Sequence, residues 1–148
     1  MTEPVRRHLA IDYGARRVGL AVNDPIGRCV TPLMVAPNAG DQRVIETICK
    51  TMDDYDIAVC VVGLPLNMDG SEGEQARRTR SFMGRLRKAR PEAEYHLWDE
   101  RLSSFAADAL MDEREDIAAK DRRGLRDRLA AMVILESFLD AHPESLHL

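Results

Sequence analysis

The chain alternates between short apolar runs and longer segments in which apolar residues recur every three or four positions. Short apolar runs with turn residues at both ends are typical of strands. Strands are therefore predicted over 7–12, 18–22, 28–33, 57–62 and 94–98. Because only short turns separate the first three, they are expected to form an antiparallel meander. The fourth follows a helical segment, so a crossover should place it parallel to the first.

Apolar residues at helical spacing predict helices over 41–52, 71–90, 103–110 and 124–140. Asp41 is expected to cap the first of them, and Ser71 with Glu74 fits a capping box at the start of the second. The last helix is apolar nearly all round, which is typical of a buried helix or of one that meets a partner. The charged stretch 112–123 is weakly periodic and is expected to form a loop.

At 148 residues the chain is predicted to form one domain, 1–148, with a core over about 7–140 and flexible termini. No apolar run approaches the roughly 18 residues that span a bilayer, so no membrane association is expected. Cys29, Cys49 and Cys60 have no paired spacing and lie among apolar residues. They are expected to be reduced, which favours a cytoplasmic protein.

The net charge of −4 does not by itself suggest a nucleic-acid-binding protein. Basic residues are nevertheless concentrated in 77–90 and 120–128. A locally basic face can attract a polyanion even on an acidic protein. The same charges are equally consistent with a solvated helix surface that carries ion pairs.

Three carboxylates stand where the predicted elements could bring them together. Asp12 ends the first strand and Glu100 follows the fifth. Asp127 begins a stripe of apolar positions on the last helix, so it should face the sheet. Each acid also has a structural explanation: a turn former for Asp12, a surface ion pair for Glu100, and a helix N-terminal acid or a partner of Arg123 for Asp127.

Carboxylates gathered at one point repel one another, by about 4 kcal/mol for a pair at 4 Å and an effective dielectric near 20. A hard divalent cation removes that repulsion, and carboxylate oxygens are the ligands that Mg²⁺ and Mn²⁺ prefer. Two such ions can clamp the attacking and leaving oxygens of a phosphodiester. The three acids therefore predict metal-assisted hydrolysis by an activated water, without a covalent intermediate.

Four motifs resemble the YqgF/RuvX family of pre-16S rRNA nucleases, also called Holliday-junction-resolvase-like proteins. They are Asp12-Tyr13-Gly14 with Arg17 and Gly19, the run 63–70, the run 99–104, and the helix start at Asp127 with Leu129 to Ala131. The resemblance covers about 7–140, in order and without large gaps. Arg126 departs from it, because the family usually has an apolar residue there.

The resemblance implies an RNase H-like α/β fold, with a five-stranded mixed sheet, its first three strands antiparallel, and helices on both faces. It assigns Asp12, Glu100 and Asp127 as catalytic residues and ligands of Mg²⁺ or Mn²⁺. Further residues are expected to contact nucleic acid or to orient the acids: Arg16, Arg17, Asn67, Arg101, Lys120, Arg122 and Arg123. The implied function is maturation of the 5′ end of 16S ribosomal RNA, with a DNA junction as the alternative substrate.

Two other functions fit parts of the sequence. A strand that ends in Asp-x-Gly also occurs in phosphate-binding ATPases and sugar kinases, but these need a second lobe for which 148 residues leave no room. An RNA-binding assembly or transcription factor on the same fold would use the basic segments and not the acids. We expect a monomer or a weak homodimer, because the apolar final helix leaves a dimer open.

Overall fold

The structure is a computed structural model that describes residues 5–101 and 119–147, with side chains of the last helix from Gly124 onward. Five strands form one sheet in the order β3-β2-β1-β4-β5. They are β1 (Arg7–Tyr13), β2 (Arg17–Asn23), β3 (Val30–Pro37), β4 (Ile57–Leu64) and β5 (Glu94–Asp99). β1 and β3 each pair antiparallel with β2, whereas β4 is parallel to β1 and β5. The predicted meander and crossover are confirmed.

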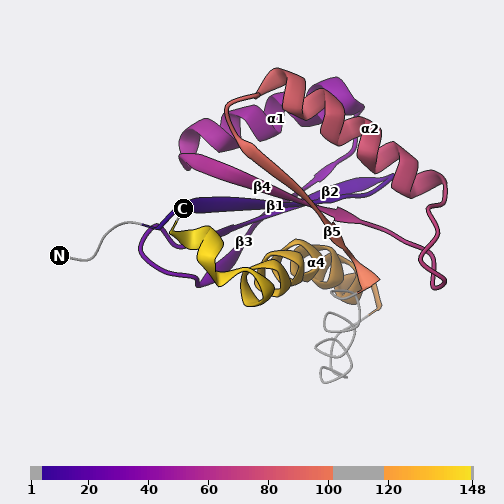
Figure 1. Ribbon diagram of the computed structural model, residues 1–148. Helices are drawn as coiled ribbons and strands as arrows, with labels where there is room; N and C mark the ends of the chain where they lie inside the picture. The colour runs from indigo at the N-terminus through magenta and orange to yellow at the C-terminus, as the bar shows by residue number, and fades with distance from the viewer. Residues whose placement is uncertain (1–4, 102–118, 148) are drawn as a thin grey trace.

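Helices cover both faces of the sheet, as the sequence predicted (Figure 1). The helices α1 (Asp41–Asp54) and α2 (Glu74–Ala89) lie on one face, and α4 (Ala119–Ala141) lies on the other. A short 3₁₀ helix, η1 (Pro143–Leu146), follows α4. None of the helices in the described part of the chain is long and apolar enough to cross a membrane.

The alternation of side chains along β1 decides which residues reach the future site. Leu9, Ile11 and Tyr13 belong to the core under α1 and α2. Ala10 belongs to the core under α4, and Asp12 follows it at the strand period of two. Asp12 therefore lies on the α4 side of the sheet, at the carboxyl end of β1.

Two predicted helix starts are wrong in detail. Gly40, with φ 107°, is the N-cap of α1, and Asp41 is the first helical residue without a side-chain cap bond. Gly73 is the N-cap of α2, so Ser71 and Glu74 do not form a capping box. Ser71 instead bonds to Asp69 in a tight turn, because a short Asp side chain competes well for nearby backbone and hydroxyl donors.

Two element boundaries also differ from the prediction. β3 runs to Pro37 and not to 33, since an edge strand tolerates Pro32 and Pro37. α4 begins at Ala119, so residues 119–123 are helical where a loop was expected. Ala, Lys and Arg are strong helix formers, which outweighs the weak apolar periodicity of this stretch. The predicted helix 103–110 and the rest of the predicted loop lie outside the described residues.

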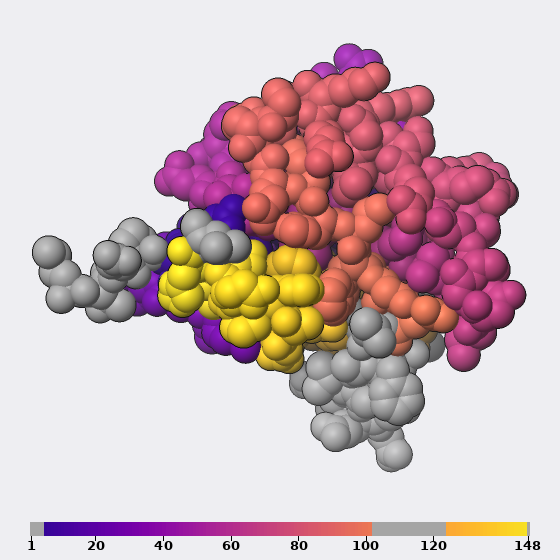
Figure 2. Space-filling view, in the orientation of Figure 1, coloured from indigo at the N-terminus to yellow at the C-terminus, as the bar shows by residue number. Residues whose placement is uncertain are grey.

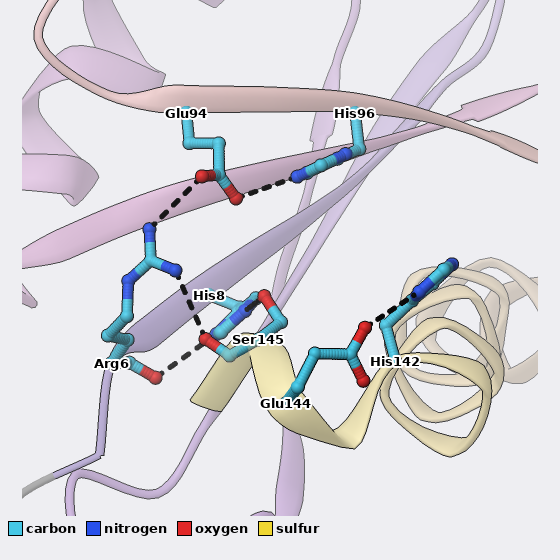
Figure 3. A network of polar contacts seen from close by, with 7 residues as sticks. All are labelled: Arg6, His8, Glu94, His96, His142, Glu144 and Ser145. Atoms are coloured by element: carbon cyan, nitrogen blue, oxygen red, sulfur yellow. Dashed lines mark hydrogen bonds and ion pairs between the residues drawn. The ribbon is translucent and has the colours of Figure 1, made fainter. Parts of the chain in front are cut away.

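The chain ends are joined at the amino end of β1 (Figure 3). The ring of His8 is fully buried, with Nε2 2.7 Å from Ser145 Oγ and Nδ1 3.1 Å from the Arg6 carbonyl oxygen. The Arg6 amide donates to the Leu146 carbonyl over 2.8 Å. Burial lowers the pKa of His8 to about 4, so this ring is neutral at physiological pH. The 3₁₀ helix η1 therefore packs back against the amino end of β1.

Candidate active site

Asp12 and Glu100 meet at the carboxyl ends of β1 and β5, the two strands that flank β4 in the sheet. Their side chains are hydrogen-bonded to each other. The Glu100 amide donates to the Leu64 carbonyl over 3.0 Å, which anchors the residue beside the end of β4. Ligand sites in α/β sheets are found at this edge, because strand ends and loops converge there.

A glycine makes room for the pair. A Cβ added at Gly63 would lie 2.5 Å from Glu100 Oε1 and 2.6 Å from Ile134 Cδ1. Real carbon atoms do not approach so closely, so a side chain at this position would displace Glu100 or push α4 away. Gly63 is therefore needed to hold the Glu100 carboxyl against the sheet.

The two carboxyls strongly perturb each other. Burial raises the pKa of Glu100, and the negative charge and hydrogen bond of Asp12 raise it further, to about 8. Burial also raises the pKa of Asp12, as does the charge of Asp127, while the hydrogen bond to Glu100 opposes that rise. A hydrogen bond between two carboxyls needs one proton, so the metal-free pair shares a proton near neutral pH.

Asp127 lies beside this pair on α4. A Cβ added at Gly19 would lie 3.0 Å from the Asp127 carbonyl oxygen and 3.9 Å from Asp12 Cβ, so helix, strand and acid come close together there. The stripe below it, Ala131, Ile134 and Phe138, is buried, which confirms that Asp127 stands above the core-facing side of α4. Its carboxylate is engaged in an ion pair with Arg17.

The three predicted acids are thus close but not gathered around one point. Among residues 5–101 and 119–147, no three His, Cys, Asp or Glu side chains are arranged to hold a metal ion. The donor set nevertheless suits a hard cation: Asp12 and Glu100 bind a shared proton that a cation would replace. Asp127 could join them as a ligand after separating from Arg17. That all three are ligands stays a prediction.

Two of the predicted flanking residues, Arg101 and Asn67, brace the loop between β4 and α2. Arg101 donates to the Asp99 carboxylate through Nε over 3.1 Å and through Nη2 over 2.8 Å. Its Nη1 donates to the Met68 carbonyl over 3.3 Å. The side-chain amide nitrogen of Asn67, Nδ2, donates to Ser71 Oγ over 3.0 Å. Arg101 and Asn67 therefore shape this loop, whatever they contact in a substrate.

The predicted basic residues differ in availability. Arg16 is exposed and makes no side-chain hydrogen bond or ion pair with the described residues. Arg17 is held by Asp127, as above. The side chains of Lys120, Arg122 and Arg123 lie outside the described residues, so their predicted contacts stay predictions.

Sequence reasoning missed two amides that hold the turn after Asp12. Gln75 Nε2 donates to the Tyr13 carbonyl over 2.9 Å, and Asn38 Nδ2 donates to the Gly14 carbonyl, also over 2.9 Å. Both come from distant segments, and nothing in an isolated Gln or Asn signals such a contact. The glycines were more informative, because a glycine within a strand often marks a close approach.

Comparison with known proteins identifies the family. Residues 6–141 match a family model described as "RuvX: Holliday junction resolvase". A protein of Anaeromyxobacter sp. (strain Fw109-5), named "Putative pre-16S rRNA nuclease", is 40% identical over 134 residues, covering 90% of this chain and 96% of the relative. One of the same name from Halothermothrix orenii is 36% identical over 141 residues, covering 95% and 99%.

Solved structures show the fold. The T. thermophilus RuvC structure in complex with a Holliday junction substrate matches with a TM-score of 0.58 and 13% identity, covering 93% of this chain and 96% of that one. The fowlpox virus Holliday junction resolvase matches with a TM-score of 0.50 and 9% identity, covering 91% and 98%. The predicted RNase H-like fold is confirmed by these resolvases, and the match over 6–141 shows that this chain belongs to the RuvX family.

Proposed function

We propose that this protein is a metal-dependent nuclease that hydrolyses phosphodiester bonds of structured RNA and acts in 5′-end maturation of 16S precursor ribosomal RNA. The observation that carries the proposal is the pair of Asp12 and Glu100, two partly buried carboxyls that share a hydrogen bond at the carboxyl ends of β1 and β5. The names of the relatives from two bacteria support the substrate. Ribosomal RNA maturation would place the protein in the cytoplasm.

We assign Asp12, Glu100 and Asp127 as the ligands of Mg²⁺ or Mn²⁺. When bound, such ions supply an activated water and neutralise charge on the phosphate. The chain itself provides three things: carboxylates that give up their shared proton, a cation at Arg16, and a second cation at Arg17 once Asp127 releases it. No side chain needs to act as a nucleophile, so no covalent intermediate is formed.

The test is cleavage of a 16S precursor transcript in the presence of Mg²⁺. Asp12→Asn, Glu100→Gln and Asp127→Asn should each abolish cleavage, while circular dichroism shows an intact fold. Asp140→Asn is the matched control, because it removes an exposed carboxylate from the same helix as Asp127 that pairs with Arg28 and not with Arg17. Normal turnover by any of the three site variants would refute the assignment of that residue.

A DNA junction is the second candidate substrate. The description of the family model names a Holliday junction resolvase, and the T. thermophilus RuvC structure holds a junction. Cleavage of a four-way DNA junction and of an RNA stem at equal concentrations would decide between them. A kcat/KM that is higher for the junction would make the DNA reaction the principal one.

A non-catalytic RNA-binding role is less well supported by the charges of α2. Most of its arginines are paired with acids of the same molecule. The pairs of arginines within α2 are Arg78 with Glu74, Arg80 with Glu72, and Arg85 with Asp41, and Arg90 directly after the helix pairs with Asp53. Exposed ion pairs leave less net positive charge for phosphates. We therefore assign phosphate contacts to Arg16, Arg17 and the basic start of α4 (Lys120, Arg122 and Arg123), with Asn67 and Arg101 at the loop, in a monomer or weak homodimer.

A further inference from the structure

An apolar side chain stands alone in solvent on the loop that follows β4. Met68 is 93% exposed, against 69% for Ile26 and 39% for Met34, the other large hydrophobic residues exposed in the described part of the chain. Scattered surface hydrophobics are common, but a nearly fully exposed methionine buries nothing in its own fold. Its surroundings therefore decide whether it has a role.

Met68 lies at the tip of a tight hairpin. The backbone amide of Asn67 donates to the Ser71 carbonyl, and the backbone amide of Gly70 donates to the Asn67 carbonyl, each over 2.8 Å. Gly70 has φ +88°, a conformation that favours glycine and closes a three-residue hairpin with a bulge. Asp69 accepts from the Ser71 hydroxyl over 2.6 Å, which adds a side-chain link across the turn.

The hairpin is also tied to the site. Arg101, the residue after Glu100, donates to the Met68 carbonyl over 3.3 Å and is itself held by Asp99. Four residues of extended chain reach at most about 14 Å, so Met68 stays within that distance of Leu64 at the end of β4. In Figures 1 and 2 the loop between β4 and α2 projects from the body of the molecule. The hydrogen-bonded hairpin thus holds an apolar tip on the loop that leaves the same edge of the sheet as the two carboxyls.

Nucleic-acid-binding proteins use such tips to separate stacked bases. An apolar side chain, methionine among others, enters a base step and unstacks it, which bends the strand. Methionine is suited to this, because it is unbranched and polarisable and adapts to irregular gaps. We propose that Met68 inserts between adjacent bases of the substrate and unstacks them next to the bond that is cleaved. This inference rests on the proposed nuclease function and adds a substrate-contact residue to it.

The proposal predicts that Met68 matters only when the bases are stacked. The probes are an RNA stem with a single-stranded 5′ extension, and the same stem with a two-nucleotide bulge at the cleaved step. Met68→Ala should lower kcat/KM on the continuous stem about tenfold or more, since base contacts of this kind have effects of that size. On the bulged stem it should stay within about twofold of wild type, because those bases are already unstacked. Met68→Leu should retain most activity on both.

Ile26→Ala is the control, because Ile26 is the other strongly exposed aliphatic residue and lies in the turn after β2, where the strand leaves the opposite end of the sheet. It should leave both rates unchanged. Equal rates for Met68→Ala and wild type on the continuous stem would overturn the proposal. So would an equal loss on both substrates, which would indicate a contact without unstacking.

A binding measurement separates this inference from the nuclease assignment. In an Asp12→Asn background, which prevents cleavage, 2-aminopurine is placed in turn at successive steps of the stem. It should brighten at one step on binding, and Met68→Ala should remove the increase. If wild type cleaves neither substrate but the fluorescence change depends on Met68, the proposed catalysis fails and the insertion stands. If cleavage occurs and the fluorescence change does not depend on Met68, the insertion fails and the catalysis stands.

Discussion

Replacing Glu100 with Gln should stabilise the metal-free protein while it abolishes cleavage. The folded state holds the pKa of Glu100 at about 8, against 4.5 for the free side chain. Between these values the unfolded chain has lost its proton and the folded chain has kept it. Stability therefore falls as pH rises from about 4.5 to about 8, because the unfolded state binds fewer protons. Gln is neutral throughout and avoids this loss.

The size of the effect follows from the shift. At 1.36 kcal/mol per pKa unit, the wild-type protein loses about 3 kcal/mol through this carboxyl by pH 7 and about 5 kcal/mol above pH 8. The difference in unfolding free energy between Glu100→Gln and wild type should be near zero at pH 4.5 and grow toward these values. For a domain with a total stability of about 5–15 kcal/mol, such a gain is large.

Urea unfolding in EDTA at pH 4.5, 7 and 8.5, followed by circular dichroism, measures this difference. Glu46→Gln is the matched control, because Glu46 is exposed on α1 and should leave the free energy of unfolding nearly unchanged at every pH. A Glu100→Gln protein that is less stable than wild type at pH 8.5 would refute the shared-proton description of the pair. So would a difference that does not change with pH.

Three further results are expected. Gly63→Ala should abolish cleavage and lower the free energy of unfolding by about 1–3 kcal/mol, because its Cβ would collide with Glu100. Gly84→Ala, whose Cβ meets nothing within 4 Å in the middle of α2, should instead raise the free energy of unfolding by about 0.5–1 kcal/mol. Urea titrations compare the two variants. The lowered pKa of His8 predicts that the free energy of unfolding falls by about 3 kcal/mol as pH drops from about 6.5 to 4, because in this range the unfolded ring is protonated and the folded ring is neutral. His8→Gln should lose that part of the acid dependence, and a stability profile equal to that of wild type would contradict the prediction. Gln75→Ala should lower kcat with little change in melting temperature, because Gln75 holds the Tyr13 carbonyl beside Asp12; a kcat equal to that of wild type would exclude this positioning role.

Strand periodicity was enough to predict much of the site. Asp12 lies at the end of a buried strand, and the alternation of β1 directs it to the α4 side, where Asp127 was expected from its place above Ala131. The sheet order and the crossover also follow from the order of apolar runs. What periodicity could not supply was the contact made by each carboxyl, because pairing depends on distances between segments that are far apart in the chain.

Local chemistry misled the prediction where a side chain had two partners to choose between. Ser71 has the spacing of a capping box with Glu74, yet it bonds to Asp69, which is closer in the chain and closes the hairpin turn. Asp41 likewise looked like a cap, but its carboxylate accepts from Tyr13 Oη and Arg85 instead. Ser71 thus donates to a nearby acceptor and Asp41 accepts from tertiary donors, and neither side chain caps the helix N-terminus. No single-segment pattern reveals these partners.

The ion pair of Arg17 with Asp127 explains how the site can be stable before it is occupied. Three carboxylates without a cation would repel one another, and two of them avoid this by sharing a proton. The third, Asp127, forms an ion pair with the guanidinium of Arg17 on β2. Both arrangements are reversible. A cation can replace the shared proton, and the Arg17 side chain can move away from Asp127. A substrate phosphate would attract Arg17, and its departure would free Asp127 at the moment when the site needs its charge. The resting structure thus compensates the charge of all three carboxyls of the proposed site.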